Sequence, residues 1–185
     1  MNPRKADRKT VEFIDDLSVD GYRMPDGEFR VGFTGASVAL GYSKEWLGRA
    51  LSRGGNTVKA LQGLGFTEEI VQVATQSIRG GGTSPKTISL RDFNRLIAYA
   101  VSDGRKAALA LQLALTELSL NDFFREAFGE APLTIDEKRE LFYKAYAATI
   151  SPENWREMDR REIVELALSG DEPQLEGGYW NSLGN

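Results

Sequence analysis

Apolar and polar residues alternate near the start of the chain with the two-residue period of a β-strand. In the segment 29–33 (FRVGF), Phe29 and Val31 fall on one side and Arg30 on the other, which predicts a half-buried strand with Arg30 toward solvent. The preceding triplet, 25–27 (PDG), favours a tight turn, because proline fixes its first corner and glycine accepts a positive φ. The pattern therefore predicts a β-hairpin formed by residues 18–24 and 28–33.

The period changes to that of a helix over residues 34–53 (TGASVALGYSKEWLGRALSR). This stretch predicts two short helices joined at Gly41-Tyr42, with Ser43 as the N-cap of the second helix. One face of the second helix is apolar and the opposite face is polar or small. The inward residues are Trp46, Leu47, Ala50 and Leu51, and the outward residues are Lys44, Glu45, Gly48, Arg49 and Ser52.

The spacing of small and apolar residues in this stretch resembles the helix-turn-helix of bacterial and phage DNA-binding proteins. That pattern has a small residue in the first helix (Ser37), a glycine four positions on (Gly41) and an apolar residue six beyond it (Leu47). Helices that cross steeply after a short turn need a small residue at their contact and a turn residue that tolerates positive φ. The resemblance implies that the second helix, residues 43–53, lies in the major groove of double-stranded DNA.

Two segments rich in β-branched residues follow, at 70–74 and 87–90, with a polar, glycine-rich loop between them that carries Arg79 and Lys86. A strand, a basic loop and a second strand after a helix-turn-helix resemble a winged helix, whose wing lies against the DNA backbone or in a minor groove. The loop differs from a nucleotide-binding loop, because Pro85 replaces its second glycine and a strand follows it. No cofactor is therefore expected.

The second half of the chain is helical in pattern. Ser89 and Thr134 each precede an acidic residue by three positions, as N-cap residues do, and Ser151 before a proline starts a further helix that runs to 169–170. The segment 107–120 is apolar almost all round, which fits either the centre of a core or half of an oligomer interface. The expected fold is α+β and mostly α, with an N-terminal β-hairpin and winged helix-turn-helix followed by a C-terminal helical bundle.

Charge and pattern together divide the chain into four parts. Residues 1–17 predict a short helix or an extended N-terminal arm, whose basic residues suit a DNA backbone. A tail with two adjacent aromatic residues, Tyr179 and Trp180, suits docking on the body or on a neighbouring subunit. The predicted parts are the arm at 1–17, the winged helix-turn-helix region at 18–90, the helical core or dimerisation region at 91–170 and the tail at 171–185.

The net charge of −4 hides an uneven distribution of charge. Residues 28–106 carry 11 Lys and Arg against 6 Asp and Glu, whereas residues 107–185 carry 7 against 15. A basic block that contains the helix-turn-helix suits a domain that meets phosphate, and the acidic block suits a protein partner. Cysteine and histidine are both absent, which excludes disulfides, thiolate zinc sites and imidazole bases, so an enzyme is not expected. No apolar run reaches the length of a membrane span and no signal-peptide pattern begins the chain, so a cytoplasmic protein is expected.

The sequence predicts a sequence-specific double-stranded DNA-binding protein that acts as a transcription regulator and a homodimer. An alternative is an adaptor module of phage or mobile-element origin that binds protein and not DNA. A metal-dependent nuclease would need carboxylates such as Glu68, Glu69 and Asp92, but their spacing does not match the arrangement that such enzymes use. Neither a metal nor a catalytic residue is predicted. The predicted DNA-binding residues are Ser43, Lys44, Glu45 and Arg49 at base edges, and Arg53, Lys59, Arg79 and Lys86 at phosphates.

Overall fold

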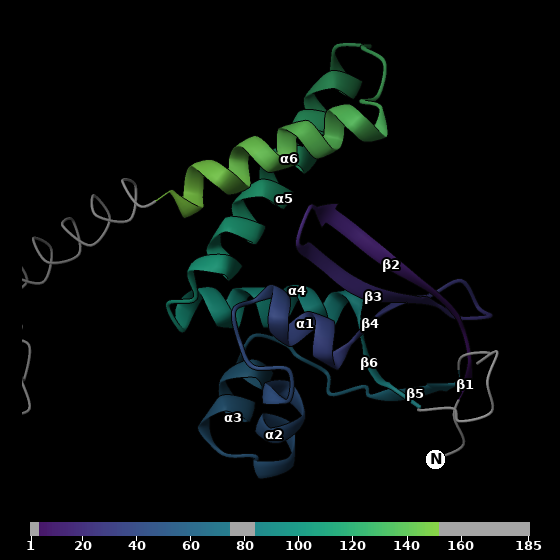
Figure 1. Ribbon diagram of the computed structural model, residues 1–185, viewed down its shortest axis with the longest axis vertical. Coiled ribbons are helices and arrows are strands. Elements are labelled where there is room, and N and C mark those ends of the chain that lie inside the picture. Colours follow the sequence, from purple (N-terminus) through teal and green to yellow (C-terminus); the bar gives the residue numbers. More distant parts are fainter. Residues whose placement is uncertain (1–3, 75–83, 152–185) are drawn as a thin grey trace, which may run out of the picture. The chain divides into compact units, whose positions relative to one another are not determined.

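A six-stranded sheet organises the residues that the computed structural model describes, 4–74 and 84–151 (Figure 1). Neighbouring strands are antiparallel except for the first pair, β1 and β5, which is parallel. The mixture of helices and sheet expected from the sequence is confirmed. In order across the sheet, the strands are β1 (Arg4–Lys5), β5 (Val71–Ala74), β6 (Lys86–Ser89), β4 (Phe29–Gly32), β3 (Leu17–Arg23) and β2 (Asp7–Ile14).

The predicted hairpin is confirmed as β3 and β4. Gly27 has a φ of 90°, and the Met24 N–H donates to the Glu28 carbonyl across the turn at 2.8 Å. The expected alternation in β4 is wrong, however, because Phe29 is 57% exposed and Arg30 is fully buried. Strand β4 lies inside the sheet, and both of its faces are covered, so a period of two no longer separates core from solvent.

A second, smaller hydrophobic cluster covers the face of the sheet that carries Arg30. The buried guanidinium donates to both carboxylate oxygens of Glu28 at 2.7 and 2.9 Å, to the Thr87 hydroxyl at 3.1 Å and to the Glu69 carbonyl. These partners compensate the burial of its charge. The cluster consists of Ala6, Tyr22, Met24, Val71 and Val73.

The N-terminal segment is extended and belongs to the sheet. Strand β1 pairs with β5, and β2 pairs along its length with β3, so the residues predicted as a short helix or an arm form strands. The end of β2 meets the helices, where the Phe13 ring stacks on Phe142 with centroids 5.6 Å apart. The charged residues that precede Phe13 leave most of β2 exposed.

Three short helices connect β4 to β5: α1 (Phe33–Ala39), α2 (Trp46–Arg53) and α3 (Asn56–Gly63). Helix α1 approaches β3 closely at Gly35, where an added Cβ would lie 3.1 Å from the backbone of both Val19 and Asp20. Leu61 packs α3 into the core, whereas Leu64, just after the helix, is 41% exposed. The main hydrophobic core lies between the sheet and the helices.

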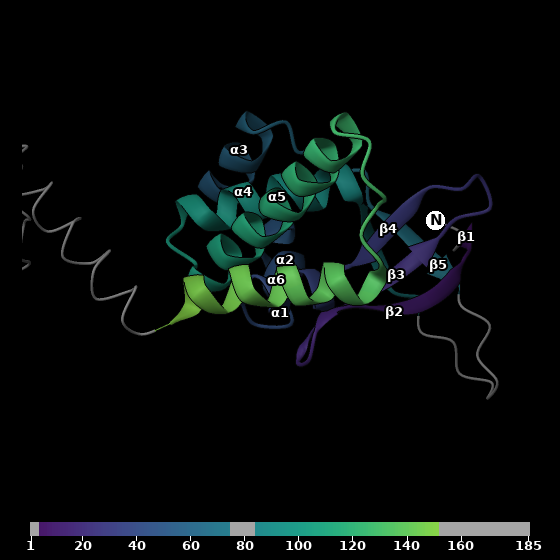
Figure 2. The same cartoon turned by 90° about the horizontal axis from the view of Figure 1, so that it is seen from above.

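Three longer helices complete the described chain: α4 (Leu90–Ser102), α5 (Lys106–Ala127) and α6 (Ile135–Ile150). Both predicted N-caps are confirmed, since Ser89 accepts from the Asp92 N–H at 3.0 Å and Thr134 exchanges hydrogen bonds with Glu137. Helices α5 and α6 form an antiparallel hairpin that packs on α4 and β2 (Figure 2).

The described helices include none that is both long enough and apolar enough to span a membrane. The chain divides into a unit at residues 1–150 and a second unit at 151–185. The predicted helix that starts at Ser151 and the predicted tail at 171–185 lie outside the described residues, except for Ser151 itself.

Candidate nucleic-acid interface

Helices α1 and α2 meet at the residues that the sequence pattern singled out. Ser37 is fully buried, and its hydroxyl donates to the Phe33 carbonyl at 2.9 Å and accepts from the Leu47 N–H at 3.3 Å. Gly41 in the turn has a φ of 80°, which a residue with a side chain rarely adopts. The small residue and the glycine thus allow the two helices to pack closely, with Leu47 fully buried beneath them.

The start of α2 differs from the prediction. The helix begins at Trp46, and Ser43 is not its N-cap: residues 43–45 form an exposed loop before the helix. The Ser43 hydroxyl instead accepts a hydrogen bond from the Arg49 guanidinium at 2.6 Å. The rings of Tyr42 and Trp46, which flank this three-residue loop, stack with centroids 3.7 Å apart.

Three of the predicted base-reading residues lie together at the start of α2, Ser43 and Glu45 in the loop before the helix and Arg49 on its outward side. Arg49 reaches back along the helix to Ser43, and its guanidinium lies 4.0 Å from the Glu45 carboxylate. The Arg49 and Glu45 side chains are 55% and 70% exposed, so both remain open to a ligand. Lys44 lies in the same loop and Arg53 ends the helix, and both are exposed. The outward side of α2 and the loop before it therefore present three cations and one carboxylate.

Gly48 lies at the centre of this outward side, and no contact within the described chain requires a glycine there. A Cβ added there would meet no atom within 4 Å, and its φ is an ordinary helical one. Glycine inside a helix costs about 0.5–1 kcal/mol relative to alanine. The chain thus gives up stability at a position where the helix backbone is open to a close approach from outside. The sequence showed Gly48 as an outward residue, but only the structure shows that its surroundings are empty.

An aromatic and ionic group holds α2 against the helices behind it. The Tyr42 hydroxyl donates to the Asp103 carboxylate at 2.8 Å, and the Arg105 guanidinium lies 4.3 Å from the centre of the Tyr42 ring. Burial and the hydrogen bond to Asp103 raise the pKa of Tyr42 above its ordinary value. The Trp46 ring, which stacks on Tyr42, also contacts Tyr99 of α4, with centroids 6.0 Å apart. Nothing in the sequence indicated the contacts of Tyr42 with Asp103 and Arg105, which are more than 50 positions away.

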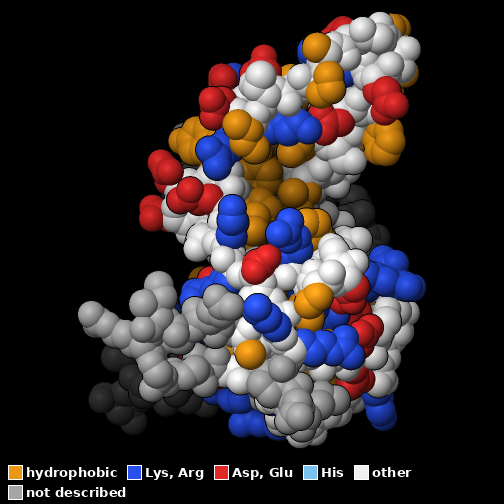
Figure 3. Space-filling view, turned by 90° about the vertical axis from the view of Figure 1, so that its right-hand side faces the viewer, with side chains coloured by type: hydrophobic (Ala, Val, Ile, Leu, Met, Phe, Trp, Pro, Cys, Tyr) orange, Lys and Arg blue, Asp and Glu red, His pale blue; other side chains and the backbone are white. Residues whose placement is uncertain are grey.

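The remaining residues that were predicted to contact phosphate lie on elements other than α2. Lys59 is exposed on α3 and Lys86 is exposed at the start of β6, whereas Arg79 lies outside the described residues. The strands expected to flank a wing do pair, with Gln72 of β5 opposite Lys86. Strand β1, the edge strand that pairs with β5, adds the exposed Lys5. Figure 3 shows lysine and arginine side chains over the lower part of one face, at the level of these strands.

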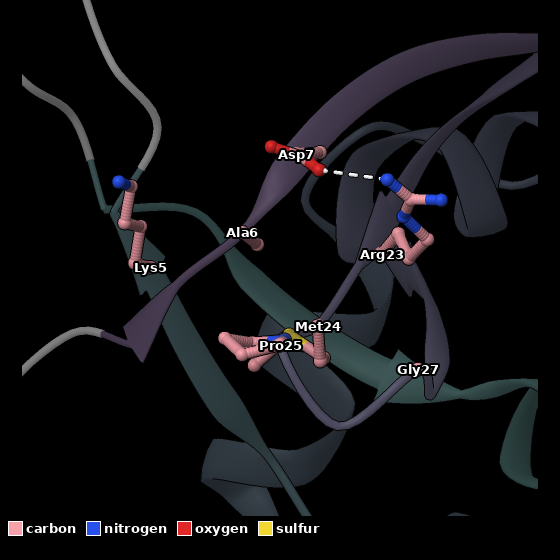
Figure 4. Close-up of a pocket in the computed structure, with 7 residues that line it drawn as sticks. All are labelled: Lys5, Ala6, Asp7, Arg23, Met24, Pro25 and Gly27. Carbon is pink, nitrogen blue, oxygen red and sulfur yellow. Dashed lines mark hydrogen bonds and ion pairs between the residues drawn. The ribbon is translucent and has the colours of Figure 1, made fainter.

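A hollow of about 500 Å³ lies between the start of β2 and the β3–β4 turn (Figure 4). Its Arg23 is already bound to Asp7, with the guanidinium and carboxylate 3.2 Å apart. Lys5 lies on the opposite side of the hollow, with Met24 and Pro25 between. These polar groups do not converge on a common point, so the hollow lacks the features of a small-molecule site.

The carboxylates considered for a nuclease have structural partners. Both oxygens of buried Asp92 accept hydrogen bonds from Thr67, one from its N–H and one from its hydroxyl, each at 2.8 Å. The Glu68 carboxylate accepts from Gln62, and the Glu69 carboxylate lies 3.8 Å from the Arg30 guanidinium. In residues 4–74 and 84–151, no group of three acidic side chains is arranged to hold a metal ion.

Comparison with known protein families, with curated proteins and with solved structures gave no significant match. Functional inference for this chain therefore depends on its own geometry and chemistry.

Proposed function

We propose that the protein is a sequence-specific double-stranded DNA-binding protein that reads the major groove with the outward side of α2 and acts as a transcription regulator. The observation that carries the proposal is the outward side itself. It combines exposed cations, a carboxylate held near Arg49 and a backbone left bare at Gly48, on a helix that buried contacts hold firmly. Side chains on a rigid helix suit the recognition of base edges.

The proposed roles follow from the chemistry of each side chain. Arg49 would pair with guanine through two hydrogen bonds, and Glu45 would accept from cytosine once Arg49 turns from it toward the bases. Ser43 and Lys44, in the loop before α2, would contact bases from the side of the helix start. Arg53, Lys59, Arg79 and Lys86 would bind phosphates, which position the protein without reading sequence.

Selection of bound sequences from a random duplex pool, followed by fluorescence anisotropy on the selected site, tests the proposal. Arg49→Ala should weaken binding to the selected site by about 1–3 kcal/mol and lower the preference for it over other sequences. Lys86→Ala should weaken binding to all sequences alike and reduce its salt dependence. Loss of neither affinity nor preference in Arg49→Ala would refute the assigned reading helix.

The alternative function, an adaptor that binds protein and not DNA, is favoured by one observation. The outer half of α5 exposes large hydrophobic side chains, among them Phe124 at 66% and Phe128 at 78%. Binding to heparin distinguishes the two functions. A DNA-binding protein should be retained and should elute earlier as salt increases. If the protein does not bind heparin and the selection enriches no duplex, the adaptor function would be favoured.

A further inference from the structure

A stripe of exposed hydrophobic side chains runs along the outer half of α5. Leu113, Leu120 and Phe124 are separated by seven and four positions, so they lie on one side of the helix, and Phe123 and Phe128 widen that side. The exposed fractions of these five side chains run from 47% for Leu113 to 78% for Phe128. These five residues are called the α5 stripe below.

The α5 stripe is not the side that α5 uses within its own unit. Leu111 is fully buried on the opposite side of the helix, and Ala114 is fully buried on its flank, both in the main core. Asp122 also points away from the stripe and binds Lys138 of α6 at 2.7 Å. Helix α5 therefore packs on α4 and α6 with one side and leaves a second apolar side open. The sequence left both interpretations of this helix open, core or interface; its buried side belongs to the core, and its open side is the one available for an interface.

The three exposed rings alone supply about half of the area that one partner contributes to a protein interface. A phenylalanine side chain buries roughly 200 Å² when covered. With exposed fractions of 66–78%, the three rings leave about 400 Å² of apolar surface open, against the ~800 Å² that each partner contributes to a stable interface. Leu113 and Leu120, which are 47% and 53% exposed, add to this area.

We propose that the α5 stripe binds the α5 stripe of a second copy of this chain, forming a two-fold symmetric dimer with antiparallel helices. Leu120 lies near the middle of the stripe, so a two-fold axis beside it would bring Leu113 near the partner subunit's Phe128 and would cover both rows of side chains. The five stripe residues carry no charge, and the exposed Glu117, which lies between Leu113 and Leu120 on the same side, is acidic, so an apolar protein surface suits the stripe better than nucleic acid. The purpose of the dimer rests on the proposed function, because two reading helices match an operator with two half-sites.

The mass of the full-length protein in solution, measured by light scattering after size exclusion without DNA, tests the dimer. Wild type should have a mass of about 41 kDa, twice the 20.5 kDa of one chain. Phe124→Arg should give the mass of one chain. Phe29→Arg is the matched control, because Phe29 is 57% exposed on β4, away from the stripe, and this variant should stay dimeric. Far-UV circular dichroism spectra that match that of wild type would show that both variants fold.

Either of two results would overturn the inference. A wild-type mass of 20.5 kDa at about 100 μM would show that the stripe has another occupant, including another part of the same chain. A Phe124→Arg variant that remains dimeric would place the dimer contact elsewhere. The proposed function fails separately: a dimer that binds no duplex refutes DNA binding alone, and a monomer that binds a selected site refutes only the dimer.

Discussion

Replacement of Gly48 by alanine should make the protein more stable and weaken its binding to DNA. The added methyl group would meet no atom within 4 Å of its own chain, so the folded state accepts it without strain. Alanine in place of glycine inside a helix gains about 0.5–1 kcal/mol, which for a chain of this size raises the melting temperature by roughly 1–4 °C. In the complex, the same methyl would occupy space where the helix backbone approaches the duplex. Overpacking of a close contact costs about 1–3 kcal/mol, and 1.4 kcal/mol corresponds to a tenfold loss of affinity.

Two matched variants separate this effect from a general change in the helices. Gly63 ends α3 and also has open space around its Cβ position, so Gly63→Ala should stabilise the fold and leave DNA affinity unchanged. Gly35→Ala should destabilise the protein, because its Cβ would lie 3.1 Å from the backbone of β3. Melting curves and anisotropy titrations on the selected duplex measure both quantities. A Gly48→Ala variant that is more stable and binds DNA as tightly as wild type would refute the close approach.

Further predictions concern the stability of the fold and its response to pH. Arg30→Ala should lower the free energy of unfolding in urea by about 2–5 kcal/mol, because it empties a fully buried site and removes a donor from its acceptors. Arg23→Ala, which breaks an exposed ion pair in the same sheet, should cost less than about 1 kcal/mol. Ser89→Ala should cost about 1 kcal/mol through loss of the α4 N-cap, and an unchanged urea midpoint would contradict this. Because the pKa of Tyr42 is raised in the folded protein, its contribution to stability is complete below about pH 10 and is lost as the pH rises further, so the decline in melting temperature above pH 10 should be smaller in Tyr42→Phe.

Local signals in the sequence predicted local features well. The turn at 25–27, the caps at Ser89 and Thr134, and the apolar face of α2 each depend on residues a few positions apart, and each is present. The inward residues of α2 could therefore be identified correctly without knowledge of the rest of the fold. The outward residues followed from the same periodicity, although their function did not.

The start of α2 was predicted wrongly although its contacts are local. Residues 43–45 form a loop, and the Ser43 hydroxyl accepts a hydrogen bond from Arg49, six positions on. The burial of Arg30, in contrast, depends on distant partners. A second cluster covers its face of the sheet, and its acceptors come from as far away as Thr87, so tertiary contacts outweigh the local alternation. Propensity and periodicity carry no information about such contacts.

Amide chemical shifts of ¹⁵N-labelled protein, recorded with and without the selected duplex, test most directly whether the outward side of α2 meets DNA. The account predicts that the shifts that change most lie at residues 44–53 and around Lys86, while those of the exposed outer half of α5, residues 120–128, stay the same. Changes confined to α5 and α6, or none at saturating duplex, would contradict it.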